Sequence, residues 1–390
     1  MLIVKRALVA VAVAAMTIGI AGCADSATTA SPDSANNPAP DKVVIGGLWA
    51  TSGPSAAYGD WYTNASELAV KEINDAGGLN GQTLVELQIE DTLAQPGPAV
   101  VAFQRLLGLD VRFVQSAFSS QTLAIMPIAN ENEIPVTNGG AQSTHLAETG
   151  DFLFNTIPLI YKESEVLAAY LHDEADAESA AVLYTSDDGG EAAYENFQDA
   201  FETAGGSVVA AEAGEYQGTD FRSQLTKLKE SGADVLIIAA FGLDSNNIIS
   251  QTREIGWDVQ IANTSWVAIP DVLANPAAEG LIHTSIPFAP TDEFVAAYET
   301  AYGETPTSGY IGNYYDGVKM WAAAYEAASD GGTKDPSGRE VADMIRELKT
   351  FDSSYGSVLS FDSQGVADRP ISISAINGGK SAVVADDYGN

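Results

Sequence analysis

The chain has 390 residues, with 53 acidic against 18 basic side chains and a formal net charge of −35. Such acidity excludes nucleic acid as a partner, because the surface repels a phosphate backbone. The histidines, His145, His172 and His283, are scattered, and the sequence has no metal-ligand spacing, phosphate-binding loop or nucleophile elbow. These absences argue against an enzyme, and we expect no metal and no cofactor.

Residues 1–22 are organised like a secretion signal. Lys5 and Arg6 precede an apolar run over residues 7–20, which is shorter than the roughly 20 residues that a membrane-spanning helix needs. The run ends in Ile-Ala-Gly before Cys23, the only cysteine of the chain. This segment resembles the bacterial lipobox, in which the cysteine is diacylated and becomes the mature N-terminus. We therefore expect lipidation of Cys23, and removal of the signal leaves a net charge of −37.

Residues 23–40 contain little that a protein core could bury and are rich in Ser, Thr, Ala, Asn and Pro. This composition predicts a flexible linker. Because two acyl chains attach a protein stably to a membrane, the expected localisation is the extracytoplasmic face of the cell membrane, through a lipid anchor. The remaining body of about 350 residues is larger than one hydrophobic core usually organises, so we expect two domains.

Apolar runs rich in β-branched residues alternate along the body with segments of helical period, a pattern typical of βα units around parallel sheets. In the first half, the expected strands are 42–49, 84–90, 111–118 and 134–137, and the expected helices are 59–76, 97–109 and 121–131. The second half repeats the plan, with helices 163–174, 191–204, 220–231 and 245–255 and strands 180–184, 207–213, 233–239 and 259–262. The predicted fold class is α/β, with two doubly wound parallel-sheet lobes.

Several segments, taken in order, resemble one known family. They are 43–48 (VVIGGL), 52–59 (SGPSAAYG), 69–81 (AVKEINDAGGLNG), 220–229 (DFRSQLTKLK), 233–237 (ADVLI), 314–320 (YYDGVKM) and 356–376, which contains Phe361-Asp362. They resemble the leucine/isoleucine/valine-binding proteins, which are solute receptors of ABC importers. The resemblance implies a type I periplasmic binding protein fold, in which a three-segment hinge joins two lobes and the ligand lies in the cleft.

The same resemblance implies lobe boundaries. Lobe 1 would consist of residues 41–159 plus 288–354, and lobe 2 of residues 160–287 plus 355–390. The chain would then cross between the lobes near Leu159, Phe288 and Tyr355.

Candidate cleft residues follow from the strand order, because ligands of open α/β sheets bind beyond the carboxyl ends of the strands. Tyr58 follows the first expected strand, Ser119 and Ser120 follow the third, and Gly139 and Gly140 follow the fourth. A serine at a helix N-terminus and backbone amides exposed by glycines would hold a carboxylate or a carbonyl group. Ordinary helix capping by the serines and a plain turn at the glycines are the structural alternatives.

The resemblance assigns roles to some of these positions. Tyr58 matches the aromatic residue that packs on the ligand side chain, and Ser119 matches the serine that binds the ligand carboxylate. The threonine that contacts both carboxylate and ammonium falls on Ala141.

In the second lobe, the family's cleft tyrosine falls on Gly189, and Phe241 replaces a later tyrosine. The acidic residue that pairs with the ligand ammonium falls near Ser265, beside Trp266. Hydrogen-bonding groups that select an α-ammonium are therefore largely replaced, which predicts that a deaminated or aromatic acid binds at least as tightly as leucine or valine. Asp187 and Asp188 are the other possible acceptors, although a solvated loop is the simpler interpretation.

The function expected from the sequence is that of the substrate-binding lipoprotein of an ABC importer. It would capture a small carboxylate-bearing solute, an amino acid or an aromatic acid, by hinge closure, and then dock on a membrane permease. The alternative is a ligand-sensing receptor or regulator on the same fold, with an amide or a urea as its ligand.

Overall fold

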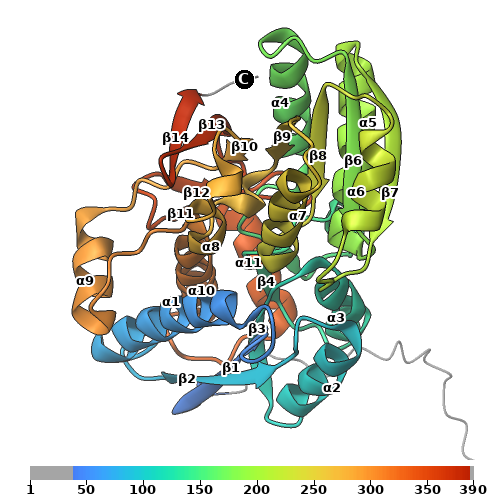
Figure 1. The fold of residues 1–390 in the computed structure, drawn as a ribbon. Coiled ribbons are helices and arrows are strands. Elements are labelled where there is room, and N and C mark those ends of the chain that lie inside the picture. The colour runs from blue at the N-terminus through green and yellow to red at the C-terminus, as the bar shows by residue number, and fades with distance from the viewer. Residues whose placement is uncertain (1–37, 387–390) are drawn as a thin grey trace, which may run out of the picture.

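The structure is a computed structural model that describes residues 38–386 (Figure 1). The expected signal peptide, Cys23 and nearly all of the expected linker lie outside the described residues. Among residues 38–386, none of the helices combines the length and the apolar character needed to cross a membrane.

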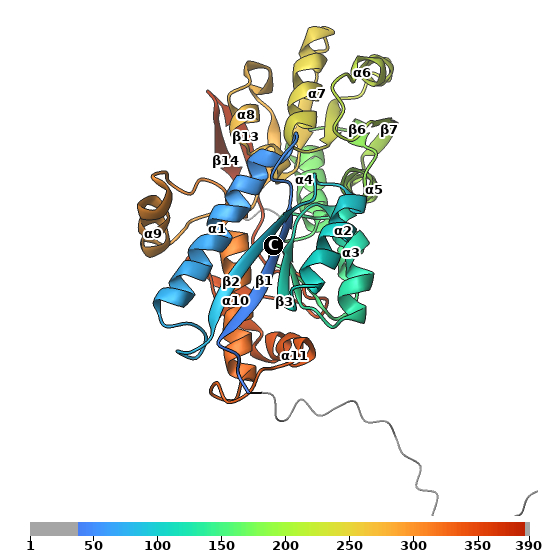
Figure 2. The same cartoon turned by 90° about the horizontal axis from the view of Figure 1, so that it is seen from below.

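The first lobe is built on a five-stranded parallel sheet with the strand order β2-β1-β3-β4-β5. Its strands are β1 (Lys42–Trp49), β2 (Leu84–Asp91), β3 (Val111–Ser116), β4 (Val136–Asn138) and β5 (Leu153–Asn155). Figure 2 shows two pairs of helices on opposite faces of this sheet: α1 (Ala56–Asp75) with α10 (Gly309–Ala328), and α2 (Pro96–Leu107) with α3 (Ser119–Glu131). Helix α11 (Gly338–Leu348) packs on α10.

The second lobe contains a seven-stranded sheet with the strand order β14-β13-β10-β9-β8-β6-β7. The parallel strands are β6 (Ser179–Thr185), β7 (Ser207–Gly214), β8 (Val235–Ala239), β9 (Gln260–Asn263) and β10 (Ile282–Ser285). The five-stranded parallel core is the predicted doubly wound sheet, and an antiparallel hairpin, β13 (Ser372–Asn377) and β14 (Lys380–Ala385), extends one edge of it. Gly378 and Gly379, both at positive φ, form its two-residue turn.

Helices cover both faces of this second sheet: α4 (Ile160–Asp173) with α5 (Asp188–Ala204) on one face, and α6 (Arg222–Lys229) with α7 (Gly242–Glu254) on the other. The middle of strand β6, residues 180–183, is wholly apolar because both of its faces are covered. Ala180 and Val182 pack with α4 and α5, whereas Ala181 and Leu183 pack in the core that contains α6 and α7. Both faces of the strand are buried, as in other doubly covered sheets.

The remaining elements are short or connect the lobes. They are the 3-10 helices η2 (Thr144–Glu148), η3 (Ser265–Val267) and η4 (Pro276–Ala278), the helices α8 (Pro270–Leu273) and α9 (Asp292–Tyr302), and the small hairpin β11 (Thr350–Asp352) and β12 (Val358–Ser360).

Within residues 38–386 the chain passes between the two sheets three times. The first passage lies between β5 and α4 and the second between β10 and α9. The third passage lies between β12 and β13. The Ala367 N–H still donates to the Asn155 carbonyl of the first lobe at 2.8 Å, so the chain leaves that lobe only between residue 367 and β13. The lobe boundaries expected near Leu159, Phe288 and Tyr355 stay a prediction.

Candidate ligand-binding cleft

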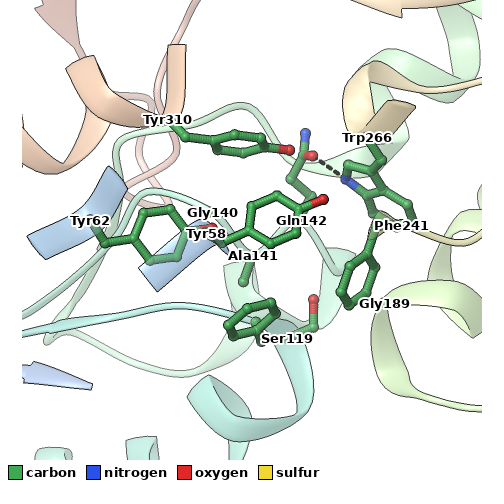
Figure 3. A pocket seen from close by; sticks show the side chains of 11 residues that line it. Tyr58, Tyr62, Ser119, Gly140, Ala141, Gln142, Gly189, Phe241, Trp266 and Tyr310 are labelled. Carbon is green, nitrogen blue, oxygen red and sulfur yellow. Dashed lines mark hydrogen bonds between the residues drawn. The ribbon is translucent and has the colours of Figure 1, made fainter. Parts of the chain in front are cut away.

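A pocket lies between the two lobes and contains about 350 Å³ of space that no atom fills (Figure 3). None of its lining residues is Lys, Arg, Asp or Glu, and six of them are aromatic. The first lobe supplies Tyr58, Tyr62, Phe118, Ser119, Gly140, Ala141 and Gln142, the second supplies Gly189, Phe241 and Trp266, and the N-terminal turn of α10 supplies Tyr310.

The aromatic wall is organised around Tyr58 in the first turn of α1. The Tyr58 ring meets the rings of Phe118 and Tyr310 edge to face, with centroids 6.2 Å and 6.0 Å away. Phe118 in turn lies 5.8 Å from Phe241, so the aromatic contact continues into the second lobe. Burial raises the pKa values of Tyr58, Tyr62 and Tyr310, which keeps these hydroxyls protonated and neutral at physiological pH.

Ser119 is the first residue of α3 and points into the pocket (Figure 3). Its Oγ accepts the Ser143 N–H at 3.2 Å, which leaves the hydroxyl hydrogen available for another acceptor. No side chain caps this helix, whose N-cap residue Phe118 has a φ of 58°. The start of α3 therefore combines a free hydroxyl donor with the partial positive charge of a helix N-terminus.

Gln142 has a fixed amide orientation. Its Nε2 donates to the Pro158 carbonyl at 3.0 Å and to Glu163, while its Oε1 accepts from the Trp266 indole N–H (Figure 3). Turning the amide over would place like groups against each other at Glu163 and at Trp266. The amide oxygen keeps one lone pair, so Gln142 can offer the pocket an acceptor but no free donor.

Seven of the ten residues proposed from the sequence line this pocket: Tyr58, Ser119, Gly140, Ala141, Gly189, Phe241 and Trp266. The structure brings them together from both lobes. Whether they contact a ligand stays a prediction.

The other three lie outside the pocket lining. Ser120 faces an adjacent groove, where its Oγ accepts the Asp188 N–H at 3.2 Å. Gly139 packs against α10, and its carbonyl accepts from Asn313 Nδ2 at 2.9 Å. Ser265, near which an ammonium-binding acid was expected, donates its hydroxyl to Glu163 at 2.9 Å.

The expected backbone clamp at the glycine loop also differs from the structure. The N–H groups of Gly140 and Ala141 both donate to Asn138 Oδ1, at 3.1 Å and 2.7 Å, and are therefore occupied. The glycines serve close packing. A Cβ at Gly140 would lie 2.9 Å from the Tyr62 hydroxyl, and one at Gly139 would lie 3.0 Å from the Tyr314 ring.

Four pocket residues were not proposed from the sequence: Tyr62, Phe118, Gln142 and Tyr310. Tyr62 lies four residues after Tyr58 in α1, which places both rings on one helix face and was available as a signal. Phe118 directly precedes Ser119, and Gln142 directly follows Ala141. Tyr310 follows the second hinge passage, and the expected strands and helices gave no indication of it.

The lobes are in contact across the cleft, so the structure shows a closed conformation. Besides the bonds of Trp266 and Asp188 to the first lobe, Asn196 Nδ2 donates to Thr144 Oγ1 at 2.9 Å. The Tyr216 hydroxyl donates to the Ala94 carbonyl at 3.3 Å.

Two second-lobe carboxyl groups lie near the mouth of the cleft without lining the pocket. Asp187 caps α5 and belongs, with Asp188, to the groove that contains Ser120. Burial raises the pKa of Asp187 to about 6, against hydrogen bonds from Thr185 and Gly189 that lower it. Burial likewise raises the pKa of Asp244 to about 7. Within residues 38–386 we find no group of three or more His, Cys, Asp or Glu residues that could hold a metal ion.

Comparison with known proteins identifies the family. The model of the periplasmic binding protein family matches residues 42–380. The chain belongs to this family. Its members bind ligands rather than catalyse reactions, and the likeness to Leu/Ile/Val-binding proteins is confirmed by a relative from Brucella suis, the Leu/Ile/Val-binding protein homolog 1. The two are 27% identical over 338 residues, which cover 84% of this chain and 88% of the relative.

Solved structures confirm the type I fold. The substrate-binding protein of a branched-chain amino acid transporter from Streptococcus pneumoniae, in complex with isoleucine, has a TM-score of 0.76 and 25% identity, covering 88% of this chain and 99% of its own. A solute-binding protein of an ABC transporter from R. palustris, in complex with benzoate, has a TM-score of 0.78 and 18% identity, covering 89% and 96%.

Proposed function

We propose that this periplasmic binding protein is the extracytoplasmic substrate-binding lipoprotein of an ABC importer. It captures a small solute that bears a carboxylate, an amino acid or an aromatic acid, and encloses it by hinge closure. The permease and the ATPase that supplies the energy are separate chains, so this chain needs no cofactor. The likeness to a Leu/Ile/Val-binding protein homolog and to solved structures in complex with isoleucine and with benzoate supports this range of ligands.

The observation that carries the proposal is the start of α3 within an aromatic pocket. A carboxylate placed there would accept the free Ser119 hydroxyl hydrogen and meet the uncapped positive end of the helix. The pocket lining contains no acidic side chain to repel it. The aromatic rings would surround the apolar part of the solute, as is usual in small-molecule sites.

Closure follows from the distribution of these groups. Most of the lining residues belong to the first lobe, which is therefore the surface that binds the solute first. Phe241 and Trp266 then cover it from the second lobe, and the bonds of Gln142 to Trp266 and of Ser120 to Asp188 hold the lobes together.

Thermal unfolding of ligand-stripped protein tests the proposal. The panel pairs each acid with its amide: leucine with leucinamide, benzoate with benzamide, and urea as a further neutral probe. A ligand at a hundredfold excess over its Kd adds about 2.7 kcal/mol of stability and raises Tm by about 4 °C. We expect an acid to do so and its amide to fail. Stabilisation by amides or urea alone would contradict the proposal and favour the sensing alternative.

The lipid anchor is tested separately at Cys23. Wild-type protein should fractionate with membranes and carry a diacylated N-terminal peptide, whereas Cys23→Ala protein should be released. A Cys23→Ala protein that remains in the membrane fraction with unchanged mass would exclude the anchor.

A further inference from the structure

Glu163 is a buried carboxylate without a cationic partner. It lies in the first turn of α4 and is 0% exposed. Each of its oxygens receives two hydrogen bonds: Gln142 and the Ser265 hydroxyl donate to Oε1, and the Ser265 N–H and Thr284 donate to Oε2. In the part of the chain that the structure describes, none of the ion pairs includes Glu163.

The Gln142 amide nitrogen and the Ser265 N–H can only donate, and they reach different oxygens of Glu163, so each carboxylate oxygen accepts at least one hydrogen bond. The four hydrogen-bonding partners of Glu163, two hydroxyls, an amide and a backbone N–H, carry no net charge. They stabilise the negative charge without cancelling it, so its field extends into the surrounding low-dielectric interior.

The cleft lies directly on the other side of Gln142. The Gln142 amide donates to Glu163 through Nε2 and presents Oε1 to Trp266 and to the pocket, so the buried charge polarises the amide oxygen. The charge also reaches Tyr310. Besides burial and the neighbouring Tyr58 and Tyr62, Glu163 raises the pKa of the Tyr310 hydroxyl. Figure 3 shows Gln142 and Tyr310 across the pocket from Ser119.

We propose that Glu163 determines the specificity of the cleft by acting through Gln142. Its charge favours a ligand with an ammonium group beside Gln142 and Trp266, and it disfavours a second anionic group there. This inference rests on the proposed function, with the ligand carboxylate at Ser119, and narrows it to an amino acid over its deaminated analogue.

This proposal also revises the expectation drawn from Ser265. That expectation treated the serine as the loss of a negative charge from the second-lobe side of the cleft. In the structure, Ser265 donates both its N–H and its hydroxyl to Glu163, at 2.8 Å and 2.9 Å. The charge is therefore present in the same region, but it is supplied by α4.

Three probes that share the isobutyl side chain separate the contributions of the ammonium and the carboxylate: leucine, its deaminated analogue 4-methylpentanoate, and its decarboxylated analogue 3-methylbutylamine. A parallel series uses phenylalanine, 3-phenylpropanoate and 2-phenylethylamine. Titration calorimetry on ligand-stripped protein compares the wild type with Glu163→Gln, which keeps the size of the side chain and an acceptor oxygen. The control is Glu165→Gln, which removes an exposed carboxylate from the same helix.

We expect the wild type to bind the amino acid more tightly than the deaminated acid. Glu163→Gln should weaken the amino acid and the amine on the order of tenfold to thirtyfold and leave the deaminated acid unchanged or tighter. Glu165→Gln should match the wild type. Glu163→Gln combined with Ser265→Asp should regain the preference for the amino acid over the deaminated acid. Glu163→Gln combined with Ser265→Asn, which adds no charge, should not regain it. Comparing these two double variants tests the charge even where Glu163→Gln alone does not fold.

The role of Glu163 is overturned if the wild type and Glu163→Gln show the same preference for the amino acid over the deaminated acid. It is also overturned if the wild type binds the deaminated acid at least as tightly as the amino acid. If only the amines bind, and they bind more weakly to Glu163→Gln, the role of Glu163 holds and carboxylate capture is wrong. A wild type that binds none of the probes overturns both.

Discussion

Asp316 and Glu163 are both buried carboxylates near the segments that join the lobes, and they are stabilised in different ways. Asp316 in α10 is 1% exposed and accepts from Arg369 at 3.2 Å, from the Ser353 hydroxyl at 2.6 Å and from the Ser354 N–H at 2.8 Å. Glu163 has neutral donors alone. The charge of Asp316 is cancelled by the Arg369 guanidinium, whereas Glu163 is stabilised by neutral hydrogen-bond donors that do not cancel its charge.

The difference corresponds to what each region does. The Arg369 guanidinium lies 3.7 Å from the centroid of the Tyr355 ring, and its Nε donates to the Thr156 carbonyl at 3.3 Å. It thereby ties α10 to the first and third passages between the lobes, a structural role for which a neutral pair is suitable. At the cleft, by contrast, a cancelled charge could not act on a ligand. The comparison therefore assigns Asp316 to the hinge and Glu163 to recognition.

The largest expected effect is on the hinge pair. Arg369→Met should lower the free energy of unfolding by about 3–5 kcal/mol, because Asp316 would remain buried without its cation. Burial already raises the pKa of Asp316 despite Arg369, and removing the cation should raise it further. Urea unfolding of the ligand-free protein measures the loss. Arg222→Met is the control, since Arg222 pairs with Asp220 and Glu254 at the surface, where such pairs contribute at most about 1 kcal/mol.

Adding Asp316→Asn to Arg369→Met should recover part of the loss, because neither charge is then left alone. Equal destabilisation by Arg369→Met and Arg222→Met would show that the buried pair has no special structural role. The contrast between a structural carboxylate at Asp316 and a recognition carboxylate at Glu163 would then fail.

The framework of the fold could be predicted because burial on two faces leaves a clear apolar pattern. Strand β1 and the end of α5 were expected at their observed residues, and β6 was expected almost at its full length. The C-terminal hairpin gave less signal. Its outer strand β14 is exposed along most of its length, so no buried face imposes a pattern.

The candidate site was predicted less well, for a related reason. Helices α4, α5 and α7 each begin three residues earlier than expected, at Ile160, Asp188 and Gly242, and α3 begins two residues earlier, at Ser119. Their first turns carry Ser, Gly, Asp or Glu in place of a full apolar repeat, and those of α3 and α5 supply Ser119 and Gly189 to the pocket. Glu163 was placed at the start of a helix and given no role. Only its tertiary contacts, 102 and 121 residues away along the chain, distinguish it from a surface acid.

A second prediction compares two neighbouring serines at the cleft. Ser119→Ala removes the free hydroxyl donor at the start of α3 and should weaken an acid ligand tenfold to a hundredfold, the value of one charge-assisted hydrogen bond of about 1.5–3 kcal/mol. Ser120→Ala removes only the acceptor for the Asp188 N–H and should weaken it much less. Calorimetry with the acid that binds best measures both. Equal effects would mean that Ser119 contributes to lobe contact rather than to carboxylate recognition.

The smallest expected effect concerns Asp244, which shows a third way to bury a carboxylate. Among the described residues it pairs with no cation, and the hydrogen bond that it accepts comes from the Gln217 N–H at 2.8 Å. Burial raises the pKa of Asp244 from 3.8 to about 7.

The raised pKa fixes the sign of a pH dependence. Between pH 4 and pH 7 the folded protein holds this proton and the unfolded chain does not, so Asp244 lowers the stability of the folded state as pH rises through this window. Asp244→Asn keeps an acceptor for Gln217 but cannot ionise. The free energy of unfolding of Asp244→Asn minus that of the wild type should increase by about 1–2 kcal/mol between pH 4 and pH 8. This figure includes a reduction for solvent screening near the cleft. Urea unfolding across this range measures the difference, with the exposed Asp199→Asn as the control. A constant difference between Asp244→Asn and the wild type at every pH would show that Asp244 stays ionised, and its burial would then resemble that of Glu163.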